Sequence, residues 1–183
     1  MGPKIRLTCV LLHPHPLKET LCQPSCSIRK IDPGAEAETI LAMVESTQVS
    51  KILITHGHFD HVEALDAVKS TTGAPVYMHP ADAEQFELKY DFPLAHNQII
   101  EIGNLRLRAI HTPGHTPGMT SLDLGDGCIL VGDTIFVGGP GKTWSPEEFT
   151  TTMRTMQEIV FAWPDETVFY PGHGPSGVIG EER

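Results

Sequence analysis

A short apolar run that ends in a cluster of histidines is the feature that most constrains this chain. Residues 51–55 read Lys-Ile-Leu-Ile-Thr, typical of a short buried strand, and residues 56–61 follow directly as His-Gly-His-Phe-Asp-His. Neither a hydrophobic core nor a random surface needs histidine at this density. Because His56 and His58 are alternate residues of an extended segment, their side chains point the same way and can meet one cation. The sequence therefore predicts a metal-binding loop at the end of a strand.

Three further loops place a histidine or an aspartate at the end of a predicted strand. They are residues 112–116 (Thr-Pro-Gly-His-Thr), 132–134 (Gly-Asp-Thr) and 171–174 (Pro-Gly-His-Gly). Asp133 follows an apolar run, and a buried carboxylate is unfavourable there unless a cation or a partner neutralises it. Its plain alternative is an aspartate that caps a turn. His115 and His173, each taken alone, are also compatible with ordinary turn histidines.

Together the four segments resemble the metallo-β-lactamase superfamily. HGHFDH matches the H-x-H-x-D-H signature of that family, and the other three loops follow in the family's order over roughly residues 31–180. The resemblance implies an α/β (α+β) fold, the αββα sandwich of two mixed β-sheets flanked by helices. It also implies two metal sites that share Asp133 as a bridging ligand. The first would comprise His56, His58 and His115, and the second Asp60, His61 and His173.

The hydrophobic pattern predicts elements compatible with that sandwich. Strands are expected at residues 5–12, 27–31, 51–55, 75–78, 98–102, 105–110, 119–124, 128–131 and 167–170, and helices at 35–47 and 62–72. A last helix should begin at Ser145, with Pro146 in its first position and Glu148 completing a capping box. Its expected apolar face comprises Phe149, Met153, Met156, Val160 and Phe161.

A two-metal centre favours hydrolysis. It lowers the pKa of a bridging water toward neutrality, supplies a bound hydroxide at pH 7 and polarises a carbonyl oxygen. Asp60 is placed to orient that hydroxide as the catalytic residue. Two Zn²⁺ ions are the expected cofactors, with iron or manganese as alternatives.

Within the superfamily the closest resemblance is to glyoxalase II-like hydrolases of hydroxyacylglutathione thioesters. Residues 132–142 (GDTIFVGGPGK) look like that group's G-D-T-L-F-x-x-G-x-G-K segment, whose lysine and a nearby tyrosine bind glutathione. Lys142 matches the lysine, and Trp144 stands at the tyrosine position as an expected pocket wall. Typical members continue with a helical domain, whereas this sequence stops ten residues after His173. We therefore expect one domain over residues 1–183, without that C-terminal domain, acting on such thioesters or on a related small ester or thioester.

Two other functions remain open. The same resemblance covers persulfide dioxygenases, in which one iron is held at the positions of His56, His115 and Asp133, a two-histidine, one-carboxylate set suited to ferrous iron. The other reading is a noncatalytic metal-binding protein.

Composition limits the partners and the compartment. Thirteen basic against 23 acidic residues give a net charge of −10, which disfavours nucleic acid and anionic membranes as partners. No apolar run reaches the roughly 18 to 20 residues of a membrane span, and the first residues do not read as an export signal. The four cysteines then read as cytosolic thiols, so we expect a cytoplasmic enzyme with a small-molecule substrate, and a homodimer stays open.

Five histidines have no assigned metal role: His13, His15, His79, His96 and His111. His79 and His96 are expected to be exposed at turns, and His111 to be a plain loop residue or to lie near the substrate. His13 and His15 lie in a Pro-rich and Cys-rich insert of unexplained role.

Overall fold

The computed structural model describes residues 32–34, 36–44, 49–103 and 105–183. The strands predicted at 5–12 and 27–31, and the insert with His13 and His15, lie outside these residues. Of the helix predicted at 35–47, the structure describes α1 (Ala37–Val44).

A small sheet carries the first ligand loop. Its described strands run parallel in the order β1 (Ile52–Leu53), β2 (Val76–Met78) and β3 (Phe92–Pro93). Most of the helix predicted at 62–72 is α3 (Leu65–Thr72), and a separate turn-length α2 (Phe59–Val62) precedes it. Gly73 ends α3 in the left-handed conformation, as expected after Thr72. The sequence reading missed α4 (Pro80–Gln85), which begins with proline in its first turn.

A larger, mixed sheet carries the other ligand loops. Its strand order is β11-β10-β7-β6-β5-β4, in which only the β10–β7 pair is parallel. The strands are β4 (Ile99–Ile102), β5 (Leu105–His111), β6 (Thr120–Asp123), β7 (Cys128–Gly132), β10 (Val168–Pro171) and β11 (Gly177–Val178). A separate hairpin joins β8 (Ile135–Phe136) to β9 (Gly139–Pro140). The four strands predicted between 98 and 131 are thus confirmed.

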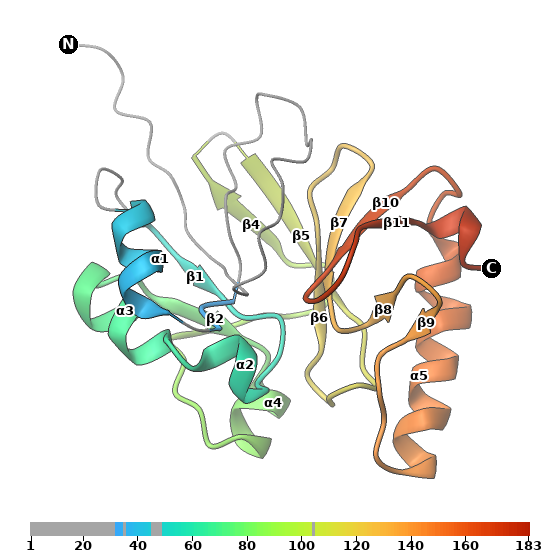
Figure 1. Ribbon diagram of the computed structural model, residues 1–183, viewed down its shortest axis with the longest axis horizontal. Helices are drawn as coiled ribbons and strands as arrows, with labels where there is room; N and C mark the ends of the chain where they lie inside the picture. Colours follow the sequence, from blue (N-terminus) through green and yellow to red (C-terminus); the bar gives the residue numbers. More distant parts are fainter. Residues whose placement is uncertain (1–31, 35, 45–48, 104) are drawn as a thin grey trace.

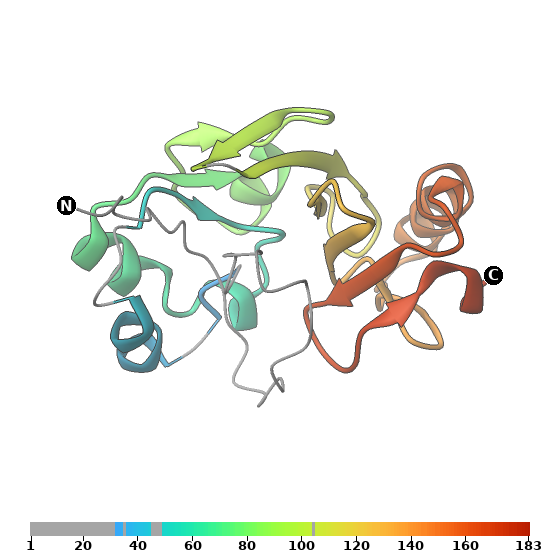
Figure 2. The same cartoon turned by 90° about the horizontal axis from the view of Figure 1, so that it is seen from above.

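The two faces of the large sheet bury different cores. Leu107 and Ala109 of β5 pack with the small sheet and with α1 and α3, whereas the adjacent Ile110 faces α5 (Pro146–Glu158). This alternation follows from the two-residue period of a strand. Figures 1 and 2 show α1 and α3 on the outer side of the small sheet and the orange α5 on the outer side of the large one. The predicted αββα sandwich is confirmed.

The last helix begins as predicted, and its buried face agrees with the prediction except at Phe149. Ser145 Oγ accepts a hydrogen bond from the Glu148 amide at 3.1 Å, and the Glu148 carboxylate accepts from the Ser145 amide at 3.1 Å, which forms the capping box. Phe149 was expected in the apolar face and is instead 54% exposed. Met156 and Val160 are buried as predicted, Val160 just after the helix ends. Thr152 and Thr155 are also buried, because α5 packs on the loop of residues 112–116, where Thr155 Oγ1 donates to the Pro113 carbonyl at 2.6 Å.

Two short 3₁₀ helices complete the fold: η1 (Val160–Ala162) after α5, and η2 (Ile179–Glu181) after β11. None of the helices in the described ranges combines the length and the apolar character needed to cross a membrane.

Candidate metal centre

The predicted ligands converge where the two sheets end side by side. The segment after β1 supplies His56 and His58 from a loop and Asp60 and His61 from the short helix α2. The loops after β5, β7 and β10 supply His115, Asp133 and His173. All seven residues therefore follow the ends of strands and are held by a rigid scaffold.

His56, His58 and His115 form the first group. Their candidate ligand atoms all lie within 4.8 Å of one another. Nδ1 of His58 and Nε2 of His115 are 2.9 Å apart, and the His56 ring lies 4.9 Å and 5.0 Å from the other two ring centroids. This is the set expected for the first metal.

Asp60, His61 and His173 form the second group by the same 4.8 Å criterion. Asp60 Oδ2 lies 3.0 Å from His173 Nε2, and the Nε2 atoms of His61 and His173 are 3.3 Å apart. Half of the Asp60 side chain is exposed, so its carboxylate borders the open side of the centre.

Asp133 lies between the two groups. Its Oδ2 atom is 3.6 Å from His115 Nε2 in the first group and 3.6 Å from His173 Nε2 in the second. Its Oδ1 atom is 3.5 Å from His61 Nε2. A single carboxylate in this position can bind two cations at once, as the bridging assignment requires.

Hydrogen bonds outside the centre fix which nitrogen His61 and His115 present to it. The Lys142 carbonyl lies 2.8 Å from His115 Nδ1, and a carbonyl only accepts, so that Nδ1 carries the proton. Nδ1 of His61 likewise donates to Asp32 Oδ2 at 2.8 Å. The Nε2 lone pairs of His61 and His115 are therefore left to face the centre, as in metal-ligating histidines.

Asp32 contacts the candidate centre and was not predicted from the sequence. It is buried, and it accepts hydrogen bonds from the Thr55 amide at 2.7 Å and from the Thr55 hydroxyl. Its carboxylate also forms a third group of candidate ligands with His56 and His61. In the sequence around Asp32, only the turn of Pro33 and Gly34 that follows it could have pointed to this residue.

Burial sets the charge of the centre. It lowers the pKa of His56 well below its usual value, lowers that of His115 to about 4, and also lowers those of His58 and His173. These four imidazoles are therefore neutral at pH 7, the form that binds metals. Burial also lowers the pKa of His61, but the hydrogen bond and charge of Asp32 outweigh it and raise the pKa overall. Burial raises the pKa of Asp133 to about 7.

Two ligand atoms are buried without a hydrogen bond from any described residue: Nε2 of His56 and Oδ1 of Asp133. Such atoms are unfavourable unless another partner binds them. A borderline divalent cation such as zinc or iron accepts both imidazole nitrogen and carboxylate oxygen. The donor set thus fits a pair of such cations.

Glycine is required where the last ligand loop meets the centre. A Cβ atom at Gly172 would collide with Asp133 Oδ1 and would lie 2.6 Å from Cε1 of His61. Any side chain at residue 172 would displace two of the candidate ligands.

The structure brings one of the two expected substrate contacts against the first group. The Trp144 ring lies 5.2 Å from the ring of His58 and 5.4 Å from that of His115, and it is 56% exposed. The exposed Lys142 places its ammonium 5.5 Å from the Trp144 ring centroid.

The remaining described histidines lie outside the centre. The rings of His79 and His111 are stacked 4.2 Å apart, and the His111 amide donates to Nδ1 of His96 at 3.2 Å. His96 is exposed as expected, but His79 is half-buried, because its Nδ1 accepts from the Ala81 amide as the cap of α4.

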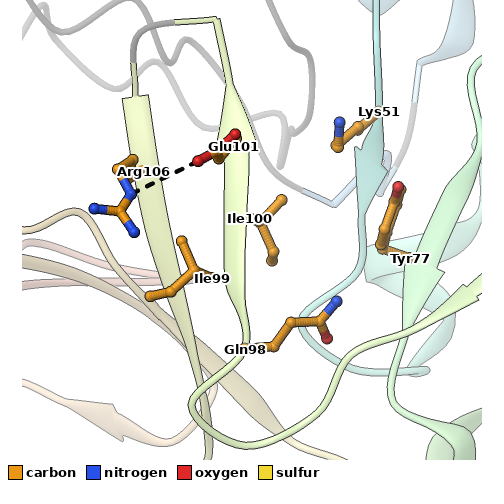
Figure 3. A pocket seen from close by; sticks show the side chains of 7 residues that line it. All are labelled: Lys51, Tyr77, Gln98, Ile99, Ile100, Glu101 and Arg106. Carbon is orange, nitrogen blue, oxygen red and sulfur yellow. Dashed lines mark ion pairs between the residues drawn. The ribbon is translucent and has the colours of Figure 1, made fainter.

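A pocket of about 330 Å³ lies at the other end of β1, between Lys51 and Tyr77 on one side and β4 and β5 on the other (Figure 3). Its Glu101 and Arg106 form an ion pair at 3.9 Å. Lys51 precedes β1 and the ligand loop follows it, so this pocket is separate from the metal centre.

Comparison with known families and sequences gives a consistent result. The family model described as the metallo-beta-lactamase superfamily matches residues 31–173. The probable metallo-hydrolase YqgX of Bacillus subtilis is 32% identical over 175 residues, which cover 83% of this chain and 82% of that protein. The hydroxyacylglutathione hydrolase GloC of Haemophilus influenzae is 28% identical, with 84% of this chain and 82% of the relative covered.

Solved structures show the same fold. The BLEG-1 B3 metallo-beta-lactamase superposes with a TM-score of 0.75 at 28% identity, covering 82% of this chain and 83% of that one. TTHA1623 in a di-iron-bound form has a TM-score of 0.68 at 28% identity, with 82% and 84% covered. ETHE1 from Myxococcus xanthus has a TM-score of 0.73 at 29% identity, with 82% and 68% covered.

Proposed function

Because this chain belongs to the metallo-β-lactamase superfamily, we propose that it is a hydrolase with two divalent cations that cleaves thioesters of the hydroxyacylglutathione type. The observation that carries the proposal is the position of Asp133, whose Oδ2 atom is 3.6 Å from a histidine nitrogen of each group. A centre for one metal does not need a carboxylate between two complete sets of ligands. The relative named hydroxyacylglutathione hydrolase supports the choice of substrate.

The groups of neighbouring donor atoms support the proposed ligands. His56, His58 and His115 would hold one cation, Asp60, His61 and His173 the other, and Asp133 both. When bound, the cations would lower the pKa of a shared water and polarise the thioester carbonyl. Zn²⁺ is the proposed metal, and the di-iron form of a similar structure makes iron the first alternative to test.

Asp60 has a second proposed role in the reaction, and two further side chains have proposed roles in binding the substrate. The half-exposed carboxylate of Asp60 borders the open side of the centre, where it can accept a hydrogen bond from the attacking water and orient it. Trp144 stands against the rings of His58 and His115, where it would form a wall for the substrate. Lys142 extends beside that wall and would pair with a substrate carboxylate.

The net charge of −10 supports a small-molecule substrate and not nucleic acid or a membrane surface. We extend the proposal to a cytoplasmic enzyme, in line with the expected reduced thiols.

Metal analysis combined with a substrate screen tests the function. We expect about two zinc ions per chain and hydrolysis of lactoylglutathione, because both ligand groups are complete. Asp133→Ala should lose metal and abolish turnover, whereas Asp126→Ala, at an exposed turn, should keep both. One iron per chain with oxygen uptake on glutathione persulfide would overturn the hydrolase in favour of the dioxygenase reading. Bound metal without turnover on any thioester or ester would favour the noncatalytic reading.

A further inference from the structure

Helix α4 contacts both loops that supply the first ligand group. At its start, His79 stacks on His111, which leads into the loop of residues 112–118. At its end, the Phe86 ring packs 5.2 Å from the ring of His58. A Cβ atom at Gly57 would collide with Phe86, so this approach is close. The helix therefore bridges a loop of the small sheet and a loop of the large sheet.

The carboxylate of Asp82 is the polar link inside this bridge. The Gly57 amide donates to its Oδ2 atom at 2.9 Å, from between His56 and His58. The Thr116 hydroxyl donates to the same oxygen at 2.8 Å, from the residue after His115. On the other side of the carboxylate, the Gly118 amide donates to Oδ1. One side chain thus holds the backbone on both sides of the first ligand group.

Burial raises the pKa of the Asp82 carboxyl group, and its hydrogen bonds with Thr116, Gly57 and Gly118 act against that shift. The residue is fully buried at 0% exposure, and all three of its partners are donors. Among the ion pairs of the described residues, none involves Asp82. Burying a carboxylate without a cationic partner is unfavourable, and three charge-assisted hydrogen bonds offset it only if both loops keep their positions.

We propose that Asp82 is the positioning residue of the first metal site, which sets the distance between the His56–His58 loop and the His115 loop. Its three hydrogen bonds go to neighbours of the candidate ligands, the amides of Gly57 and Gly118 and the hydroxyl of Thr116. The second group has its own buried carboxylate, Asp32, which contacts His61 directly. Each metal site would then depend on a separate buried aspartate.

This inference rests on the two-metal centre proposed above, and its test measures metal binding instead of turnover. The variant is Asp82→Asn, which keeps the size of the side chain but turns an amide group toward at least one donor. The control is Asp91→Asn. Asp91 also accepts hydrogen bonds, from the Val76 amide at 2.8 Å and from Lys69 Nζ at 2.6 Å. It follows α4 in the chain and contacts the small sheet away from the ligands. Cobalt(II) titration followed by absorption spectroscopy resolves the two sites, with His58→Ala and His173→Ala as spectral references for loss of each one.

We expect Asp82→Asn to bind the first cobalt ion about 10- to 100-fold more weakly, the range typical when a group that orients ligands is lost. The remaining spectrum should match that of His58→Ala, and the second site should keep its affinity. Asp91→Asn should retain both sites. Thr116→Val removes one donor with little change of volume and should weaken the first site in the same direction by a smaller factor.

Equal affinity for both cobalt ions in Asp82→Asn and the unaltered protein would overturn the inference. Loss of both sites together, with a larger fall in melting temperature than in Asp91→Asn, would also overturn it, since Asp82 would then be a stabilising residue only. A protein that binds two cations and hydrolyses no thioester would refute the proposed reaction and leave the role of Asp82 intact.

Discussion

Nδ1 of His61 lies 2.8 Å from a carboxylate oxygen of Asp32, and both residues are buried. This contact orients the ring and leaves Nε2 for the second cation. Asp32→Ala should therefore weaken the second metal site by about 10- to 100-fold and spare the first. Competition with a chelator measures the two affinities, and Asp66→Ala, at an exposed position of α3, is the control. Equal weakening of both sites would contradict the assignment.

Gly172 is the position where an added methyl group should do most damage. Gly172→Ala would push into Asp133 and His61, so we expect loss of bound metal and of activity. Gly174→Ala is the matched control. Its φ of +77° disfavours alanine by about 1 kcal/mol, but a Cβ there meets nothing within 4 Å. It should lower the free energy of unfolding and keep the metal. Metal analysis and denaturant unfolding of both variants distinguish the two effects, and full metal content in Gly172→Ala would refute this one.

The free energy of unfolding should decrease as the pH is lowered, because of His79. Burial and the neighbouring His111 lower the pKa of His79 to about 4 in the folded protein, against an ordinary value of 6.5. Between these two values the unfolded chain binds a proton that the folded protein does not, so the free energy of unfolding decreases as the pH falls from about 6.5 to 4. Because the ring is half-exposed and screened by solvent, we expect this contribution to be on the order of 1 kcal/mol.

His79→Asn isolates that contribution. Asparagine can still accept from the Ala81 amide at the start of α4, but it does not titrate. Denaturant unfolding of the two proteins at several pH values, in the same metal state, should show a shallower pH dependence for the variant. Parallel curves would rule out His79 as the source.

Lys142 should affect substrate binding and not metal binding. Its main-chain carbonyl, and not its ammonium, accepts from His115, so Lys142→Ala keeps the hydrogen bond at 2.8 Å. We expect KM for glutathione thioesters to rise about fivefold, the effect of losing an exposed ion pair of about 1 kcal/mol, with kcat and metal content unchanged. Lys89→Ala, also exposed, should leave KM unaltered. An unchanged KM in Lys142→Ala would exclude the proposed contact with a substrate carboxylate.

The ligand loops could be predicted because in each one a histidine or an aspartate directly follows a predicted strand, where these residue types are uncommon without a functional reason. The sequence reading brought together His56, His115 and Asp133, which lie far apart along the chain, only through a resemblance to a known order of motifs. Asp32 and Asp82 carry no such signature, since each is a lone aspartate whose partners come from other elements. Asp82 nevertheless had a local signal: a proline in the first turn and an acidic residue near the start are typical of a helix N-terminus, and they mark α4.

The one wrong position in the predicted face of α5, Phe149, has a similar cause. Periodicity places Phe149 on one stripe with Met153 and Met156, but it does not show that the first turns of the helix pack on a loop and not on a sheet. That loop approaches so closely that a Cβ atom at Gly114 would lie 2.6 Å from the Cα atom of Thr152. Small hydroxyl side chains fit there, and Phe149 is left in solvent.

Each ligand group takes residues from both halves of the sandwich: His56 and His58 face His115, and Asp60 and His61 face His173. A cation held in either group would therefore cross-link the two β-sheets at the edge where their loops meet. Since such an ion binds only when the halves are correctly docked, its binding free energy adds to the free energy of folding. The metals would therefore stabilise the packing of the two sheets against each other, and a chelator would weaken that packing as well as abolish activity.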